Sequence, residues 1–295
     1  YPGADSIAVW GGEDNDPISY GKVFVSVKPS QFSNNLTSSE KSVLKTELKN
    51  LSMLTVRPEV VDSEILQILL TTNFKYDPTK TSKSKSALET LVRAAIISYD
   101  DNNLSGFDTI FRHSQLLGSI DVVEPSILSN ITTLKLRRNV KATVDGTASG
   151  YTVPFGNALY NPHTGHNSSS GGIVESTAFK VSGDNTDYQF DDDGSGNIRR
   201  YSLVDSVRVY KDNNAGTIDY STGKVTINSL TLASTANTDS SIDFTVIPSS
   251  NDVISNRNQL LDITAAEISV TGVGDTVASG ETSAGVGYTT TSSYS

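Results

Sequence analysis

The spacing of apolar residues changes once along this chain, near Gly146–Gly150, and that change limits the folds open to it. Before this point, segments with helical spacing are interspersed with segments in which every second residue is apolar. After it, only segments of the second kind remain, in short runs separated by Gly, Asn and Asp. Helical spacing predicts helices that pack on a sheet, and short alternating runs predict antiparallel strands. We therefore expect an α+β protein whose second half is all β.

The first half has four segments typical of strands and two segments typical of helices. The expected strands are 22–28, 55–57, 65–76 and 131–140. Thr37–Glu40 and Ser86–Glu89 both have the capping-box pattern, in which a hydroxyl and a carboxylate bind the free N–H groups of a helix start. A short extra helix is expected over 107–114, closed by Gly118. The order β-α-β-β-α-β predicts a ferredoxin-like unit over residues 22–145.

The remaining segments complete the expected domain organisation. Residues 146–270 are predicted to form an antiparallel β-domain, with turns at Asp191–Asn197 and Asp212–Gly216. Residues 1–21 are expected to be an extended segment or loop. Residues 271–295 are rich in Gly, Ser and Thr, and their few apolar side chains cannot offset an ordering cost of roughly 1–2 kcal/mol per residue. We expect this last segment to be ordered by strand addition or by a partner.

Charge and composition exclude several classes of protein. The chain carries 33 acidic and 23 basic side chains, and residues 146–295 alone have 16 acidic and 7 basic ones. Nucleic acids and anionic membranes attract basic surfaces, so neither is an expected partner. The absence of Cys excludes disulfides, thiolate nucleophiles and cysteine metal sites. No apolar run approaches the roughly 20 residues that span a bilayer.

One turn has the spacing of a calcium loop. Asp191, Asp193 and Ser195 occupy positions one, three and five, and Gly196 supplies the sharp turn at position six. Position twelve is Ser202, however, where such a loop needs a bidentate Glu, and the flanking segments are typical of strands. We expect a hairpin turn without metal, and calcium binding is the alternative.

Other candidate residues point to packing or to loops. His163 and His166 lack a third metal ligand, and the acidic turn Gly11–Pro17 is expected to be solvated or to face a protein partner. His113 has no nucleophile placed beside it by any motif, and Trp10 is expected to anchor packing rather than to hold a ligand. The sequence thus predicts no catalytic residues, no cofactor and no enzyme activity.

Several segments carry a family resemblance. Tyr1–Lys28 contains GGEDNDP followed by YGKVF, and the likeness continues through Phe111–Ser114, Asp191–Ile198 and Gly216–Gly223. These segments resemble the C-terminal part of the baseplate wedge proteins of T-even-like contractile-tailed bacteriophages. That family comprises gene-six products and is related to the baseplate J-type family. Because the chain begins at Tyr1, we expect it to be a piece of a longer protein.

The resemblance implies a structural role. It implies a subunit of the tail baseplate in the virion, assembled in the host cytoplasm, that dimerises and joins wedges into a ring around the tail tube. It also implies contacts with other wedge proteins and rearrangement when the sheath contracts. The alternative from the residues is a secreted or surface calcium-dependent binding module built from the β-half. An enzyme, such as a depolymerase with carboxylates along a groove, comes third.

Overall fold

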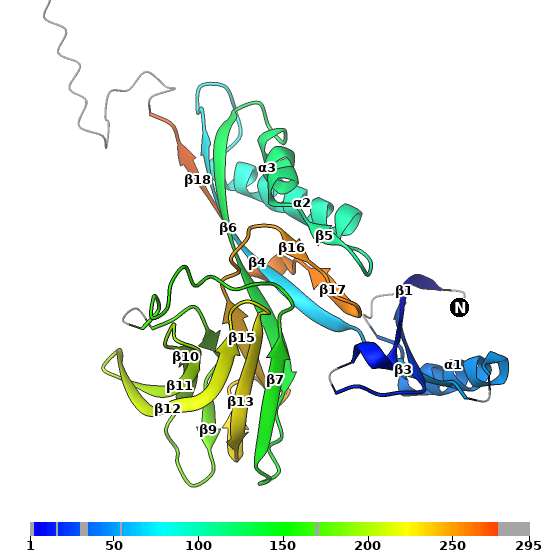
Figure 1. The fold of residues 1–295 in the computed structure, drawn as a ribbon. Coiled ribbons are helices and arrows are strands. Elements are labelled where there is room, and N and C mark those ends of the chain that lie inside the picture. The colour runs from blue at the N-terminus through cyan, green and yellow to red at the C-terminus, as the bar shows by residue number, and fades with distance from the viewer. Residues whose placement is uncertain (1–2, 16, 30–34, 54, 169–170, 277–295) are drawn as a thin grey trace, which may run out of the picture. The chain divides into compact units, whose positions relative to one another are not determined.

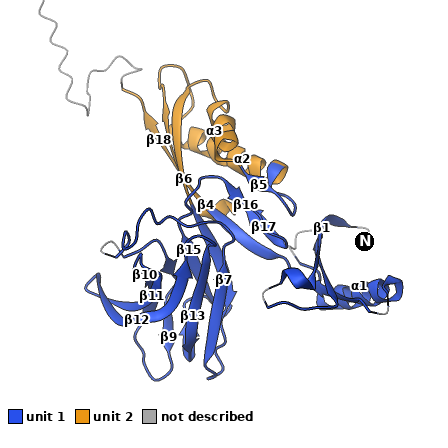
Figure 2. Ribbon diagram, in the orientation of Figure 1, with its two compact units in different colours: residues 1–68, 103–111, 135–262 blue, residues 69–102, 112–134, 263–295 orange. Residues whose placement is uncertain are grey.

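The computed structural model describes residues 3–15, 17–29, 35–53, 55–168 and 171–276 (Figure 1). The chain divides into two compact units, which Figure 2 distinguishes by colour. Unit 1 comprises residues 1–68, 103–111 and 135–262, and unit 2 comprises residues 69–102, 112–134 and 263–295. Strands β4 (Glu64–Tyr76) and β6 (Ile127–Lys141) each run from one unit into the other.

Unit 1 begins with what we call the N-terminal layer, a three-stranded sheet with one helix. Its elements are β1 (Ala4–Gly11), the 3₁₀ helix η1 (Gly12–Asp14), β2 (Lys22–Pro29), α1 (Ser38–Leu51) and β3 (Arg57–Val61). Strand β2 pairs antiparallel with β1 and parallel with β3, so α1 is the crossover that parallel strands require. The capping box is confirmed, since Thr37 Oγ1 accepts the Glu40 N–H and the Glu40 carboxylate accepts the Thr37 N–H.

The rest of unit 1 is built on two larger sheets. The seven-stranded sheet has the order β14-β9-β10-β11-β12-β13-β7, and all its pairs are antiparallel. Its strands are β7 (Ser149–Pro154), β9 (Phe179–Val181), β10 (Tyr188–Asp192), β11 (Asn197–Val204), β12 (Val207–Asp219), β13 (Lys224–Leu230) and β14 (Leu232–Thr235). The six-stranded sheet has the order β17-β4-β6-β15-β8, and β18 also pairs with β4. Its further strands are β8 (Glu175–Ser176), β15 (Ser241–Val246), β17 (Gln259–Asp262) and β18 (Ile268–Gly274).

An aromatic stack joins these two sheets in unit 1. The ring centroids of Phe179 and Phe190, on neighbouring strands of the seven-stranded sheet, lie 4.6 Å apart. Phe190 lies 5.9 Å from Phe244 of β15, and all three side chains are almost fully buried. Aromatic burial of this kind contributes the largest apolar areas to a core. A two-stranded sheet of β5 (Ile110–Phe111) and β16 (Val253–Ile254) completes unit 1.

Unit 2 packs two helices against the remaining parts of β4 and β6. The helices are α2 (Lys85–Asn103) and α3 (His113–Asp121). Buried residues follow helical spacing along both: Leu88, Val92, Ile96 and Tyr99 on α2, and Leu116 and Ile120 on α3. Strand β18 pairs in parallel with β4 from Leu70 to Tyr76. No helix in the described part of the chain is long and apolar enough to cross a membrane.

The broad α+β class is present, but the ferredoxin-like unit is not confirmed. That unit would place its four strands in one sheet, whereas β2 and β3 belong to the three-stranded sheet and β4 and β6 to the six-stranded one. Within residues 1–21, Ala4–Gly11 form β1, which pairs with β2 with one irregularity between Ala4 and Ser6. Strand addition does occur for 271–274, which lie in β18, while 277–295 lie outside the described residues.

Three local predictions are wrong. Ser86 and Glu89 do not form the expected capping box, because helix α2 already begins at Lys85. At this helix start Ser84 Oγ accepts the Ala87 N–H, and the Glu89 carboxylate instead accepts the Gly272 N–H at 2.9 Å. The turn expected at Asp212–Gly216 lies inside β12, which continues through bulges in its pairing with β11. The helix expected over 107–114 is instead β5 followed by α3, which contains Gly118.

Candidate functional site

The calcium-like turn joins β10 and β11, so the predicted hairpin is confirmed. Within it, Asp193 Oδ1 accepts the N–H groups of Ser195 at 2.8 Å and Asn197 at 3.0 Å, and Asp193 Oδ2 accepts the Asn197 amide at 2.7 Å. Partial burial acts to raise the pKa of Asp193, but these hydrogen bonds outweigh it and the pKa is lowered. The Asp193 carboxylate thus closes the turn on itself.

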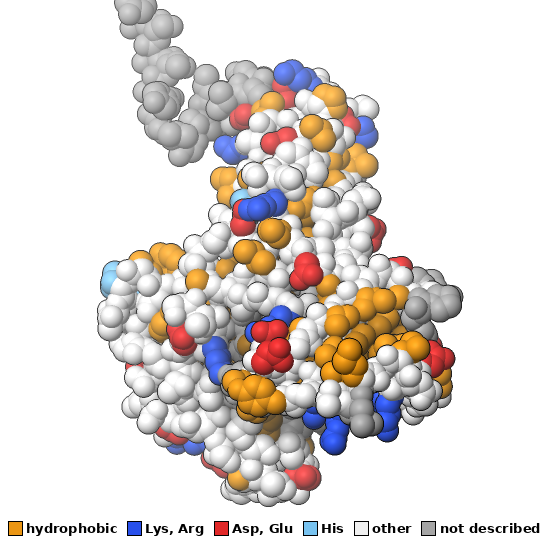
Figure 3. Space-filling model, turned by 45° about the vertical axis from the view of Figure 1, so that its right-hand side comes forward, with side chains coloured by type: hydrophobic (Ala, Val, Ile, Leu, Met, Phe, Trp, Pro, Cys, Tyr) orange, Lys and Arg blue, Asp and Glu red, His pale blue; other side chains and the backbone are white. Residues whose placement is uncertain are grey.

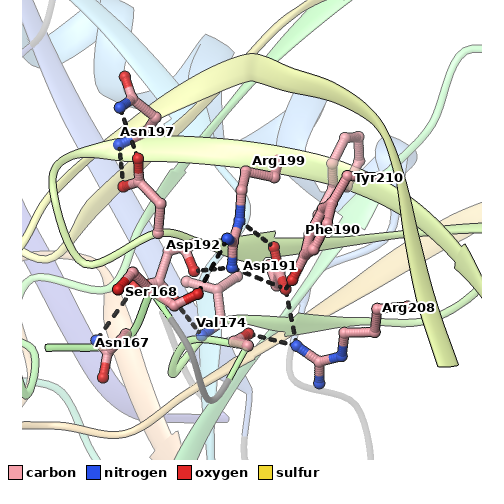
Figure 4. Close-up of polar contacts among 12 residues, drawn as sticks. Asn167, Ser168, Val174, Phe190, Asp191, Asp192, Asn197, Arg199, Arg208 and Tyr210 are labelled. Carbon is pink, nitrogen blue, oxygen red and sulfur yellow. Dashed lines mark hydrogen bonds and ion pairs between the residues drawn. The ribbon is translucent and has the colours of Figure 1, made fainter. Parts of the chain in front are cut away.

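Asp191 is buried and points away from that turn, towards Arg199, Arg208 and Tyr210 (Figure 4). Its carboxylate binds Arg199 in a two-bond contact, at 2.9 and 3.2 Å, and also binds Arg208 at 2.7 Å and the Tyr210 hydroxyl at 2.9 Å. Burial raises the pKa of the Asp191 carboxyl, against the Tyr210 hydrogen bond and the Arg199 charge. Its oxygens are therefore occupied by protein donors.

Metal binding at this turn stays a matter of prediction. No group of three His, Asp or Glu side chains suited to a metal occurs among the residues that the structure describes. The two guanidinium groups on Asp191 support the expectation that calcium does not bind there, because a cation would have to displace them.

Asp192, which the sequence did not single out, fixes a neighbouring loop. Its Oδ1 accepts the N–H groups of Ile173 at 2.6 Å and Val174 at 2.9 Å. Its Oδ2 accepts the Tyr220 hydroxyl at 2.6 Å and the Asn167 amide at 3.2 Å. Burial and this carboxylate raise the pKa of Tyr220. The only signal in the sequence was the run of three Asp residues, which does not indicate which one is buried.

Further contacts hold the same loop against the hairpin. Arg199 Nη1 donates to the Ser168 carbonyl at 3.3 Å, and Arg208 Nη1 donates to the Gly171 carbonyl at 2.5 Å. Gly172 has a positive φ of 85°, and a Cβ there would lie 2.1 Å from Asp192 Oδ1. The carboxylate cluster, made of Asp191, Asp192, Arg199 and Arg208, thus holds the loop to the hairpin. Its donors and acceptors bind one another and the loop, so it offers no free nucleophile or base.

The histidines that the sequence singled out are bonded to protein. His166 Nδ1 lies 3.2 Å from His163 Nε2, and His113 Nε2 lies 2.9 Å from the Thr132 carbonyl. The acidic turn forms η1, and its Asn15 side chain accepts the Trp10 indole N–H at 2.8 Å. None of these contacts brings together a catalytic group and a second reactive side chain.

The N-terminal layer leaves an apolar surface uncovered. Leu44 and Leu48 of α1 pack on β2 and β3, and no residue of α1 is fully buried. On β1, Ile7 and Val9 lie on the same face as α1 but are 49% and 62% exposed. A groove of about 410 Å³ runs between them and the helix. We call this surface the open face, made of Ile7, Val9, Leu44, Leu48 and Leu51; apolar side chains gather over this part of unit 1 in Figure 3.

Two family models match consecutive parts of the chain. Residues 1–61 match the model described as baseplate structural protein gp6, C-terminal domain I. Residues 64–139 match the one described as baseplate structural protein gp6, C-terminal domain III. A search of curated proteins gave no match.

The match boundaries agree with the structure. The first match ends at Val61, the last residue of β3, and therefore covers the whole N-terminal layer. The second begins at Glu64, the first residue of β4, and ends within β6. Residues 1–61 and 64–139 thus match C-terminal domains I and III of baseplate structural protein gp6, and these matches identify the chain as a structural component of the phage tail baseplate in the virion.

Proposed function

We propose that this chain joins baseplate wedges by pairing with a second copy of itself through the open face of domain I. The proposal rests on one observation, that a single helix covers only part of a three-stranded sheet. Leu44 and Leu48 lie over β2 and β3, whereas Ile7 and Val9 of β1 have no covering element within the described residues. An uncovered apolar surface of this kind marks an interaction site, because water contact with it is unfavourable.

The open face has the two parts that a two-fold contact needs. In such a contact one patch meets the same patch of the partner, so it must contain both the protruding and the receiving side chains. Here Val9 on the strand provides the receiving side, and Leu51 of α1, which is 86% exposed, provides the protruding side. Placing α1 of each copy over β1 of the other would bury both sets at once.

A structural role also fits the buried carboxylates. Asp191 and Asp192 are saturated by arginine, tyrosine and backbone donors, so neither is available to bind a substrate. We extend the proposal to the wider assembly: contacts with other wedge proteins, ring closure around the tail tube and rearrangement on sheath contraction. These follow from the family and from the open face together, and the chain needs no enzyme activity or cofactor for them.

Site-specific cross-linking tests the pairing, because the chain contains no Cys. A Val9→Cys variant treated with a short bismaleimide should give a covalent dimer on a denaturing gel. A Val122→Cys variant is the matched control, since Val122 is 81% exposed on unit 2. A dimer with Val9→Cys alone supports the proposal. Equal cross-linking of both variants, or of neither, would contradict it.

A further inference from the structure

Unit 1 has a second hollow, on the opposite face of β1 and β2 from the open face. Side chains alternate between the two faces of a strand, so Trp10 and Phe24 point away from the side of Val9 and Val25. The hollow beside them has a volume of about 770 Å³, within the range of sites for small molecules. It belongs neither to the buried carboxylate cluster nor to the proposed pairing surface.

One wall of this hollow is aromatic. The rings of Trp10 and Phe24 are stacked as a cross-strand pair, with centroids 5.7 Å apart and planes at 16°. The indole N–H is already donated to Asn15. The indole also packs against the buried cluster of Ala8, Phe107 and Leu260, and the part of it that lines the hollow can offer a ligand apolar contact but no hydrogen bond.

The facing residues supply planar amides. Asn256 donates its amide N–H to the Gly156 carbonyl at 2.7 Å, and Asn258 donates to the Asp62 carbonyl at 3.2 Å. In both side chains the amide oxygen has no partner among the residues described. Each amide is thus held in place by its nitrogen while its oxygen is left to accept a hydrogen bond.

The charges in the hollow are nearly all compensated. Asp62 pairs with Lys41 at 2.8 Å, and Glu64 pairs with Arg138. Arg257 is exposed, and its guanidinium has no partner in the described part of the chain. Its φ of 49° lies in the left-handed region, which is uncommon for a non-Gly residue.

We propose that this hollow binds an uncharged oligosaccharide. A sugar ring has a face of C–H groups that packs on a flat aromatic surface, and a rim of hydroxyls that both donate and accept hydrogen bonds. Trp10 with Phe24 provides the surface, the amide oxygens of Asn256 and Asn258 accept, and Arg257 donates. A phosphorylated ligand is the alternative, because Arg257 is a cation and both carboxylates are already paired, and the test below distinguishes the two.

The test uses the fact that Trp10 is the only tryptophan in the chain. Its fluorescence reports on this hollow directly, without a label and whatever the association state of the chain. Maltotriose, cellotriose and chitotriose are titrated separately, and inorganic pyrophosphate serves as the charged comparison. A saturable change with at least one trisaccharide and none with pyrophosphate supports the proposal. A response to pyrophosphate alone, or to none of the four, overturns it.

Variants then locate the binding. Arg257→Gly removes the guanidinium and suits the positive φ, so the fold is retained while the Kd should rise at least about tenfold. Asn258→Ala should weaken binding in the same direction. Arg57→Ala, an exposed arginine of β3 outside the hollow, is the matched control and should leave the Kd unchanged. An unchanged Kd in both Arg257→Gly and Asn258→Ala would overturn the proposal.

Discussion

The guanidinium of Arg199 and the carboxylate of Asp191 meet edge to edge inside unit 1, with Nε 2.9 Å from Oδ1 and Nη2 3.2 Å from Oδ2. Arg208 and Tyr210 occupy the rest of Oδ2. A buried pair of this kind is sensitive to the loss of one partner, because the remaining charge is left without compensation. The hairpin whose sequence resembles a calcium loop therefore anchors residues 167–168 and 171–174.

Removal of the Asp191 carboxylate should destabilise the fold strongly. Asp191→Ala leaves two guanidinium groups without their carboxylate, and we expect a loss of about 3–5 kcal/mol in the free energy of unfolding. Asp187→Ala is the control, since Asp187 is exposed and its ion pair with Lys180 is long, at 3.8 Å. This variant should change the free energy of unfolding by less than about 1 kcal/mol. Urea denaturation measures the free energy of unfolding of both variants, and equal losses would contradict the prediction.

A pair of glycines separates backbone strain from contact with Asp192. Gly172 and Gly183 have nearly equal φ values of 85° and 83°, but only a Cβ at Gly172 meets another atom, Asp192 Oδ1 at 2.1 Å. Both Ala variants should lose the roughly 1–2 kcal/mol that a left-handed L-residue costs. Gly172→Ala should lose more stability, because the Asp192 carboxylate must also shift to make room for the Cβ. Thermal unfolding tests this, and equal melting temperatures for the two variants would contradict it.

Acid should weaken the β12–β13 turn through Asp219. Hydrogen bonds from Ser221 and Thr222 lower the pKa of Asp219 from 3.8 to about 2. Between these values the unfolded chain binds a proton that the folded chain does not, so the contribution to stability is complete above about pH 4 and is lost as the pH falls towards 2. Asp219→Asn should lower the melting temperature at neutral pH and reduce its fall over this range. Parallel melting curves for both proteins from pH 5 to 2 would refute the assignment.

Calcium should not bind to the turn at Asp191–Asn197. Asp193 closes the turn and Asp191 is paired with arginines, so neither carboxylate is free for a cation. Calcium at millimolar concentration, or a chelator, should leave the melting temperature unchanged. A rise with calcium that Asp193→Asn abolishes would instead favour a calcium-dependent binding module.

Local patterns predicted much of the fold, because they depend on neighbours in sequence. The Thr37–Glu40 capping box, the helical stripe from Leu88 to Tyr99 and the β10–β11 hairpin are all encoded within a few residues. The second capping box was wrong because tertiary contact competes: Glu89 binds the Gly272 N–H, 183 residues away in sequence. A local pattern cannot register such a partner.

The arrangement of strands and the candidate sites depended on distant pairings. Strands β17 and β18 pair in parallel with β4, although about 190 residues separate them, so the period of each strand gives no hint of its neighbour. The same holds for Asp191 of β10, because its partners Arg208 and Tyr210 lie on β12, two strands away in the sheet. The open face could not be predicted either, because Val9 has the alternation of any half-buried strand.

Sedimentation equilibrium tests the central claim most directly. If the open face of domain I joins two copies, the chain should sediment as a dimer of the 31.5 kDa protomer at micromolar concentration. Val9→Glu should shift it to the monomer, because a carboxylate would then be buried in an apolar contact, while Val122→Glu should remain a dimer. A chain that is monomeric throughout, or a dimer that Val9→Glu leaves intact, would contradict the account.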